Sequence, residues 1–350
     1  RMLPVAAVAA AGLVLAGCGA AQSGAATGST TIRFANVLPP DDAISETIDW
    51  WMDEVGERTD GSVGFAHNYS GSLISGGEMY AGLADGRAQA GMIVPGYHPA
   101  ELPLFNIAQV PVPFDAETRA LALQRLLEEN EDVRAEFTEA GITPLFVTMV
   151  AAPWGYASSE PAESLEDMAG QRIRMLPNVA PAYEEFGVEP VAISSDEIYE
   201  SIERGVIDGA SQPFDTWHST SVYEVAPYMV IHGIGAYGAG LVAVNSGVFE
   251  SLDDSTRTAL EETARETFQE SSKIFAEREA HACEEVLAAG AVVTRLSDAD
   301  IEEFRSVAQR ELVDLWYEAA ERAGHDRAVL EGIWAEYNDY LAELAPDSSY

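Results

Sequence analysis

The first part of the chain alternates between short apolar runs and longer segments with helical spacing. Strands are indicated by alternating apolar residues that include β-branched and aromatic side chains, and helices by apolar residues that recur every three to four positions. The predicted order is strand 31–37, helix 43–58, strand 62–67, helix 78–85 and strand 88–95. This β-α-β-α-β order indicates a parallel sheet with covering helices.

Ligands of such sheets bind beyond the carboxyl ends of the strands. In this chain that edge is expected to carry residues 36–42, 69–73 and 96–98. The candidate ligand-binding side chains in these segments are Asn36, Ser72 and Tyr97.

The same plan repeats after a proline-punctuated segment at 102–114, a long helix predicted at 117–140 and a strand at 143–150. We place a change of domain near residues 154–157. The second unit is predicted to contain strand 171–176, helix 179–186, strand 189–193, helix 196–204, strand 206–211, an aromatic loop at 212–217, and strands 228–232 and 240–245. The pattern therefore predicts an α/β protein with two units of similar plan.

A helical pattern then runs almost unbroken over residues 252–289, a length of roughly 55 Å at 1.5 Å per residue. That exceeds the diameter of one small domain, so this helix is expected to lie along both. Strand 292–296 and helices 298–323 and 328–344 follow. Their expected core residues are Phe304, Leu312, Trp316, Leu330, Trp334 and Tyr337.

Two arginines on one short strand are the first candidate chemistry. Strand 171–176 carries Arg172 and Arg174 on one face, because side chains alternate along a strand. The chain has 58 acidic and only 19 basic residues, so the pair needs a reason. We expect Arg172 to pair with a surface carboxylate. Arg174 is predicted to hold an anionic ligand group with its planar, permanently charged guanidinium.

The composition limits the classes of partner. A formal net charge of −39, with Lys273 as the single lysine, argues against nucleic acid, whose phosphates would be repelled. It does not indicate a cationic ligand, because net charge bears on solubility and association rather than on the chemistry of a site. The hydrophobic content of 47% is that of a folded globular protein.

The N-terminal residues resemble a bacterial lipoprotein signal, predicted at 1–18. The apolar run at 5–16 is too short to span a bilayer and suits the core of a signal peptide. The sequence L-A-G-C follows, which makes Cys18 the predicted lipidation site; an ordinary signal with an incidental cysteine is the alternative. Residues 19–30 are small and polar and are predicted to be a flexible tether. The other cysteine, Cys283, has no partner and is expected to be a small buried residue.

Motifs of catalysis and metal binding are weak in this sequence. Residues 233–238 (G-I-G-A-Y-G) match a dinucleotide pattern, but a strand-like segment follows where a helix is required. The six histidines have no ligand spacing. We therefore predict no enzyme activity, no cofactor and no metal, and an extracellular enzyme remains only a minor alternative.

Three segments together resemble the extracytoplasmic solute receptors of TRAP transporters, the DctP-like family. They are F-A-N-V-L-P-P-D-D with E-R-T-D-G-S-V, then D-M-A-G-Q-R-I-R-M, and then E-I-Y-E-S-I-E-R-G-V-I-D-G-A. The resemblance extends over residues 31–344. It implies a two-domain periplasmic-binding-protein-like fold with a hinge and a long domain-spanning helix. It also implies a ligand that closes the cleft and a membrane permease that receives it. The domains are expected to be 31–151 with about 240–282, and 152–239 with about 283–345.

The resemblance also implies roles for three residues. Gly170 and Ile173 align the family's carboxylate-clamping arginine with Arg174. Gln212 stands where the family commonly has a ligand-contacting asparagine, and Tyr237 matches a tyrosine that commonly lines the cleft.

One departure affects the expected ligand. Many members carry a second arginine about twenty residues earlier, where this chain reads P-W-G-Y-A. A two-arginine clamp for a dicarboxylate or sialic-type acid is therefore not expected. An aromatic-walled pocket is predicted instead, formed by Trp154, Tyr156, Phe214, Trp217 and Tyr237. Such a wall suits an apolar or ring-bearing monocarboxylate, and it also suits a cation.

The predicted function is that of a TRAP receptor that binds a small organic acid, outside the cytoplasm, in the periplasm or anchored to the cell membrane by lipid. The expected partners are that acid, the permease and the membrane. Because of Arg174, the acid is expected to be a carboxylate. Two alternatives stay open: an ABC-type binding lipoprotein, and a TRAP receptor for a neutral or cationic ligand.

Overall fold

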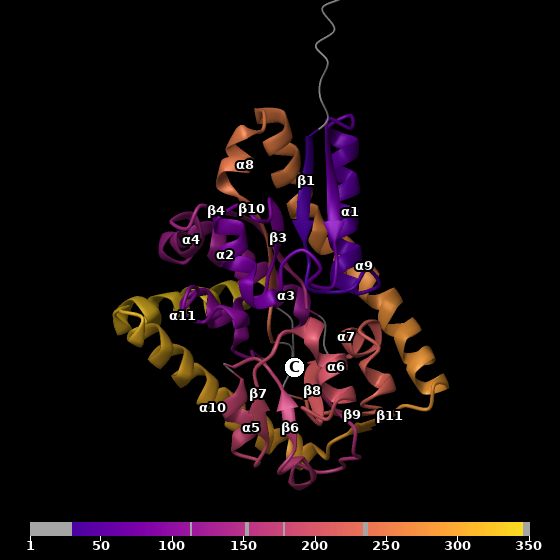
Figure 1. The fold of residues 1–350 in the computed structure, drawn as a ribbon. Coiled ribbons are helices and arrows are strands. Elements are labelled where there is room, and N and C mark those ends of the chain that lie inside the picture. The colour runs from indigo at the N-terminus through magenta and orange to yellow at the C-terminus, as the bar shows by residue number, and fades with distance from the viewer. Residues whose placement is uncertain (1–29, 113, 151–153, 178, 234–236, 346–350) are drawn as a thin grey trace, which may run out of the picture.

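The computed structural model describes residues 30–112, 114–150, 154–177, 179–233 and 237–345. Its strands form two separate sheets, and helices cover both (Figure 1). The predicted two-unit α/β fold is confirmed. Residues 1–18, including Cys18, lie outside the described residues, as does the predicted tether apart from Thr30, which begins the first strand.

The first sheet has the strand order β2-β1-β3-β10-β4. The parallel sheet predicted from the first part of the chain is confirmed, because β1 pairs in parallel with both β2 and β3. The two remaining strands, β4 and β10, continue the sheet in antiparallel pairing. The strands are β1 (Thr30–Ala35), β2 (Val63–Asn68), β3 (Ala90–Ile93), β4 (Ile142–Thr148) and β10 (Gly240–Asn245).

The second sheet has the order β11-β9-β5-β8-β6-β7. Its parallel part, β7-β6-β8, repeats the arrangement of β2-β1-β3, and β5 joins it through antiparallel pairing with β8. The strands are β5 (Trp154–Ser158), β6 (Arg172–Arg174), β7 (Glu189–Val191), β8 (Gly209–Pro213), β9 (Tyr228–Ile231) and β11 (Val292–Arg295).

Helix α1 (Ala43–Arg58) shows how local sequence and burial act together. Asp42 is its N-cap and accepts a hydrogen bond from the Ile44 backbone N–H, which satisfies one of the free donors at the helix start. Ile48, Trp51 and Val55, three to four residues apart, are completely buried against the first sheet.

The other helices have these bounds: α2 (Met79–Ala84), α3 (Ala116–Glu129), α4 (Glu131–Thr138), α5 (Ala180–Glu184), α6 (Ile198–Glu203), α7 (Phe214–Ser219), α8 (Ser246–Ser251), α9 (Asp254–Ala288), α10 (Asp298–Arg322) and α11 (Arg327–Leu344). Short 3-10 turns are η1 (Gly76–Glu78), η2 (Pro95–Tyr97), η3 (Phe105–Gln109), η4 (Glu166–Met168), η5 (Ser195–Glu197) and η6 (Val222–Glu224).

Several sequence predictions are corrected by the structure. The single helix predicted at 117–140 is two helices, because Asn130 ends α3 and its side chain caps α4. The helix predicted at 252–289 begins only at Asp254, with Asp253 as its N-cap. The predicted aromatic loop at 212–217 is the end of β8 followed by α7, which starts directly after Pro213. Cys283 is exposed rather than buried, because it lies on the outer face of α9.

Helix α9 lies along both units, as predicted (Figure 1). It packs on α1 and β4 of the first unit and on α7 of the second, and its 35 residues span about 52 Å at 1.5 Å per residue. The predicted core aromatics of α10 and α11 pack into the large core, with Phe304, Trp316 and Tyr337 buried and Trp334 partly buried. Helix α11 packs against α3. The division into domains by residue range stays a prediction.

None of the helices among the described residues is long and apolar enough to cross a membrane.

Candidate functional site

A cavity of about 70 Å³ lies where the two units face each other. Most of its wall is apolar. From the first unit it is lined by Leu38, Ile44, Met92, Val94, Tyr97, Val150 and the segment Gly238, Ala239 and Gly240; from the second unit come Arg174, Leu176, Ser195, Gln212, Pro213 and Thr216. Several of these residues follow the carboxyl ends of parallel strands, which is the edge predicted for a ligand site.

Arg174 is the charged residue of this wall. Arg174 is the last residue of β6, and only 4% of its surface is exposed. The guanidinium donates to the carbonyl of Ile193 at 2.9 Å, to that of Ser211 at 3.4 Å and to the Tyr97 hydroxyl at 2.6 Å. Among the described residues it has no carboxylate partner. A buried cation with only neutral acceptors retains the capacity to bind an anion strongly.

Tyr97 connects the two units at this point. It ends η2 in the first unit, and its hydroxyl accepts from Arg174 and from the Ser195 backbone N–H at 3.0 Å. Its ring also lies beside the guanidinium, with the Arg174 Cζ 5.7 Å from the ring centroid. The Tyr97 oxygen therefore takes up one N–H of the Arg174 guanidinium that could otherwise donate to an oxygen of an anionic ligand.

Gln212 supplies an unused amide. It lies in β8, its residue is 1% exposed, and neither its Oε1 nor its Nε2 has a hydrogen-bond partner among the described residues. A buried amide left without partners costs about 1–3 kcal/mol. A ligand with both a donor and an acceptor would recover that cost.

A buried hydrogen-bond network supports β8 from behind. The Tyr183 hydroxyl contacts Ser211 Oγ at 2.7 Å and His232 Nε2 at 2.8 Å, and Tyr237 reaches Ser211 Oγ at 2.8 Å. Burial raises the pKa of Tyr237 to about 12 and lowers that of His232 to about 3. These groups are therefore neutral at physiological pH, and they hold the strand that carries Gln212.

Four of the five predicted wall aromatics, Tyr156, Phe214, Trp217 and Tyr237, are not among the residues that line the cavity. Tyr156 is fully buried in β5, and Tyr237 belongs to the network behind β8. Phe214 and Trp217 pack on each other, with ring centroids 5.5 Å apart, and the Trp217 indole N–H donates to the carbonyl of Ala226. The backbone of Trp154 pairs with Pro213.

Asn36 and Ser72 are also outside the cavity wall. The Asn36 side chain bonds Ser45 Oγ and His67 Nε2 and accepts from the Leu38 N–H. Ser72 is exposed and donates to the carbonyl of Tyr69. Asn36 thus shapes the turn that presents Leu38 to the cavity.

Most of the apolar lining was missed by sequence reasoning, although Leu38 lies within the predicted edge segment 36–42. Leu38, Met92, Val94 and Leu176 have the signature of ordinary core residues, so their own pattern carries no site signal. Their position at or just beyond strand ends is the one signal that could have found them.

The other arginine of β6 behaves as predicted. Arg172 forms an ion pair with Asp208 at 2.7 Å, and both side chains are partly exposed. That guanidinium holds the pKa of Asp208 below its usual range.

Polar side chains join the two units beside the cavity. Asp42, at the start of α1, accepts from Ser219 Oγ at 2.9 Å and from Thr216 Oγ1 at 3.2 Å, both in α7. In return, Asp215 of α7 accepts from the Ala43 N–H at 2.9 Å. Burial, with Asp215 close by, raises the pKa of Asp42 to about 7.

Arg278 of α9 balances this acidic contact. Its guanidinium contacts Asp215 at 3.2 Å and Glu46 at 2.5 Å. Because α1, α7 and α9 all contribute, the contact fixes the start of α1 relative to the second unit.

The chemistry offered by the cavity is binding. It combines one guanidinium, one amide and apolar walls, which suits an anion with an apolar body. No group of three or more His, Cys, Asp or Glu residues placed to hold a metal ion occurs in the part of the chain that the structure describes.

Comparison with protein families gives one match over most of the chain. The model of the family DctP, described as "bacterial extracellular solute-binding protein, family 7", matches residues 34–319.

Curated relatives are similar over parts of their length. The ectoine-binding periplasmic protein TeaA of Halomonas elongata is 25% identical over 60% of this chain and 63% of its own. A solute-binding protein of Chromohalobacter salexigens is 26% identical over 41% of this chain and 43% of its own, so the chain matches less than two thirds of either relative. The 2,3-diketo-L-gulonate-binding periplasmic protein YiaO of Escherichia coli is 24% identical over 85% of this chain and 90% of its own.

Solved structures share the fold over their whole length. A TRAP solute-binding protein of Rhodoferax ferrireducens, in complex with copurified benzoate, has a TM-score of 0.81 at 18% identity and covers 92% of this chain and 100% of its own. A TRAP solute-binding protein of Desulfovibrio salexigens, with bound orotic acid, has a TM-score of 0.78 at 21% identity and covers 90% of this chain and 99% of its own.

Proposed function

This chain belongs to the bacterial extracellular solute-binding proteins of family 7, and on that premise we propose that it is the receptor of a TRAP transporter and binds a small organic acid between its two units. The observation that carries the proposal is the buried guanidinium of Arg174, which faces the cavity with only neutral acceptors. Proteins of this family are receptors for solutes rather than enzymes.

The ligand class is a monocarboxylate with an apolar or ring-shaped body. Because the cavity of about 70 Å³ is smaller than the space of about 150 Å³ that holds one benzene molecule, a ring-shaped body requires the two units to move apart. Arg174 provides a positive charge for the anion, with the Tyr97 hydroxyl on one of its donors, the Gln212 amide provides a neutral donor and acceptor, and the rest of the wall is mostly apolar. A second carboxylate would find no second arginine in this wall. The benzoate and orotic acid bound by two proteins of similar fold support this class.

A cationic ligand has less support. It would need aromatic faces around the charge, whereas Phe214 and Trp217 pack within the second unit. Arg174 would also repel it.

We place the receptor at the membrane surface through a lipid on Cys18, with residues 19–29 as the tether and the TRAP permease as the partner that takes the ligand. The support is the apolar run at 5–16 followed by L-A-G-C. Replacing Cys18 with serine in a cell that expresses the full chain is expected to abolish incorporation of labelled palmitate and to move the protein from the membrane fraction to the soluble one. Unchanged labelling would contradict the anchor.

The test of the binding site is the Arg174→Met variant. Ligands are first found by a thermal-shift screen of monocarboxylates, dicarboxylates, sugar acids, ectoine and amines. A ligand at 100 times its Kd stabilises the protein by about 2.7 kcal/mol. Removing the buried charge partner of a bound carboxylate is expected to weaken binding by about 2–5 kcal/mol, measured by calorimetry.

Arg172→Met is the matched control. It removes an arginine from the same strand, but one whose guanidinium is paired with Asp208 outside the cavity. Its ligand affinity should equal that of the unmodified protein. Equal affinity in Arg174→Met, or hits restricted to amines, would overturn the proposed role of Arg174.

A further inference from the structure

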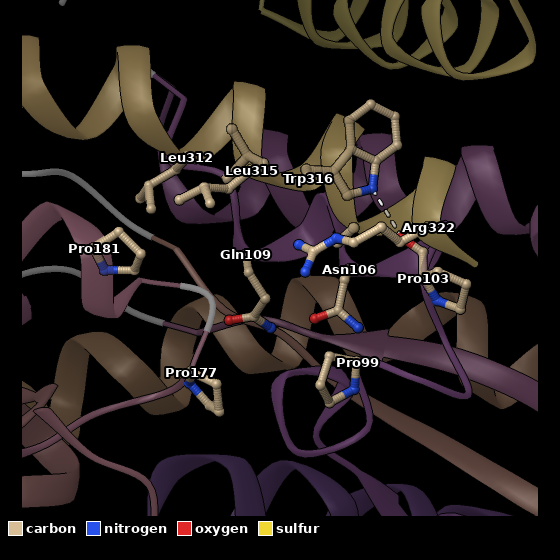
Figure 2. Close-up of a pocket in the computed structure, with 12 residues that line it drawn as sticks. Pro99, Pro103, Asn106, Gln109, Pro177, Pro181, Leu312, Leu315, Trp316 and Arg322 are labelled. Atoms are coloured by element: carbon tan, nitrogen blue, oxygen red, sulfur yellow. Dashed lines mark hydrogen bonds between the residues drawn. The ribbon is translucent and has the colours of Figure 1, made fainter. Parts of the chain in front are cut away.

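A second and larger cavity, of about 180 Å³, is lined in part by Pro177, which follows Leu176 of the first cavity in the chain (Figure 2). One wall is α10, with Leu312, Leu315 and Trp316, and the opposite wall comes from the segment around η3. Two prolines of the second unit, Pro177 and Pro181, complete it. The lining is mostly apolar, and neither the family nor the proposed receptor function accounts for it.

Gln109 is the feature of this cavity that points to a ligand. Its residue is 2% exposed, and both its Oε1 and its Nε2 lack hydrogen-bond partners among the described residues. Figure 2 shows this amide between Pro177 and Asn106, facing the space that the other residues enclose. Since a buried amide without partners has lost its bonds to water and gained none in return, a bound group that pairs with it is favoured.

A positive charge lies over the same space. Arg322, in the last turn of α10, extends its guanidinium inward above Gln109 and Asn106 (Figure 2). Its Nε donates to the carbonyl of Glu318 at 3.1 Å, and it forms no ion pair with a carboxylate of the described residues. In a chain with 58 acidic residues, this arginine is available to an external anion.

The aromatic wall is held in place. The Trp316 indole N–H donates to the carbonyls of Pro103 and Leu104 at 3.0 and 3.2 Å. Its ring is therefore fixed against the cavity rather than free to fill it.

We propose that this cavity is a second ligand site, which takes a single-ring monocarboxylate with a polar ring substituent. The ring would pack against Trp316, Leu312 and the prolines, the carboxylate would meet Arg322, and the substituent would pair with the Gln109 amide. The volume agrees, since a cavity of about 150 Å³ holds one benzene molecule.

The two cavities share a wall, so a test has to separate them. Leu176 lines the first cavity and the next residue, Pro177, lines the second. A Cβ at Gly96 would lie 3.0 Å from Leu176 Cδ1 and 3.3 Å from Gln109 Cδ, which puts both side chains against the same backbone.

The experiment is a titration of the full-length protein with para-hydroxybenzoate, followed by calorimetry, in an Arg174→Met background that disables the first cavity. Binding is expected to persist there. Ala319→Phe, which places a ring in the second cavity from a half-buried position of α10, should abolish it. Arg322→Gln should weaken it about two- to fivefold, the effect of an exposed ion pair.

Two comparisons make the result specific. Arg310→Gln removes an exposed arginine of the same helix that pairs with Glu311 outside the cavity, and it should leave the affinity unchanged. Gln109→Leu should reduce the affinity for para-hydroxybenzoate about fivefold but spare that for benzoate, which lacks the hydroxyl.

Failure of para-hydroxybenzoate to bind the Arg174→Met protein at millimolar concentration would overturn the second site. Equal binding by Ala319→Phe would overturn it as well. Neither result affects the proposed receptor function, which rests on the first cavity and on the loss of binding in Arg174→Met alone.

Discussion

At the scale of single residues, Gly209 fixes how two strands of the second sheet approach each other. A Cβ at this position of β8 would lie 2.0 Å from the carbonyl oxygen of Ala157 and 2.9 Å from the Ser158 Cα, both backbone atoms of β5. Backbone atoms of a paired strand cannot move aside as a flexible side chain can. The strand that carries Gln212 therefore depends on a glycine here.

Gly209→Ala is expected to destabilise the protein by about 1–3 kcal/mol, the usual cost of overpacking, as measured by urea unfolding. Gly64→Ala in β2 is the control, because a Cβ there meets no atom within 4 Å. Its stability should stay within about 0.5 kcal/mol of the parent protein. Equal stabilities of the two variants would contradict this explanation.

The chemical type of a residue also decides whether its place in the candidate site can be predicted from the sequence. Arg174, Gln212 and Tyr97 line the cavity. Arg174 and Tyr97 could be named because a charged or polar residue at or near a strand end stands out, and Gln212 because of the family resemblance. The aromatic residues could not be assigned in the same way. A ring near a strand end fits a pocket wall and a hydrophobic core equally well, and the structure puts Phe214 and Trp217 in a core.

At the scale of elements, the break between α3 and α4 depends on Asn130. Its Oδ1 accepts from the Val133 N–H at 3.1 Å, and its Nδ2 donates to Glu336 of α11 at 2.7 Å. Apolar spacing continues through this position, which is why one helix was predicted. The N-cap signature, an asparagine followed by Glu131 and Asp132, was the signal that could have shown the break.

Asn130→Ala is expected to lower the free energy of unfolding by about 0.5–2 kcal/mol through loss of the cap. Asn130→Ser retains a capping oxygen and should recover most of that loss, even though the contact with Glu336 is gone. Thermal and urea unfolding of both variants give the comparison. A serine variant as unstable as the alanine one would show that the contact with α11, not the cap, is what matters.

At the scale of the whole molecule, the acidic contact between the units predicts a dependence on pH. The folded-state pKa of Asp42 is raised to about 7, whereas an unfolded aspartate titrates near 3.9. Between these values the folded protein binds a proton that the unfolded chain does not. The contribution of Asp42 to stability is therefore full below about pH 4 and is lost as the pH rises through 7.

The groups that face Asp42 are Asp215, Thr216 and Ser219 of α7, with Glu46, Arg278 and Glu279 close to the same contact. Asp42→Asn imitates the protonated form and can still cap α1. It is expected to be more stable than the parent protein at pH 8, by up to about 4 kcal/mol, since the shift of about three pKa units corresponds to about 1.4 kcal/mol per unit. The difference should shrink as the pH falls from 7 and vanish below about pH 4.

Asp253→Asn provides the reference for this comparison. Hydrogen bonds from Ser255 and Thr256 lower the pKa of Asp253, the N-cap of α9, to about 2, so its charge does not change between pH 5 and 8. Its stability relative to the parent protein should be independent of pH in that range. Parallel curves for the Asp42 and Asp253 variants would contradict the titration assigned to Asp42.

The unbroken course of α9 has a mechanical consequence. One half of this helix is fixed to α1 and the other to α7, so any rotation of one unit against the other has to bend a continuous rod. The Ser272 hydroxyl, near the middle, lies 2.6 Å from Glu117 Oε2 and 3.1 Å from the carbonyl oxygen of Phe268. Its single proton is expected to go to the nearer, charged acceptor, which links the middle of α9 to α3 of the first unit. Any bending is therefore expected in the part of the rod beyond Ser272, toward the contacts with α7.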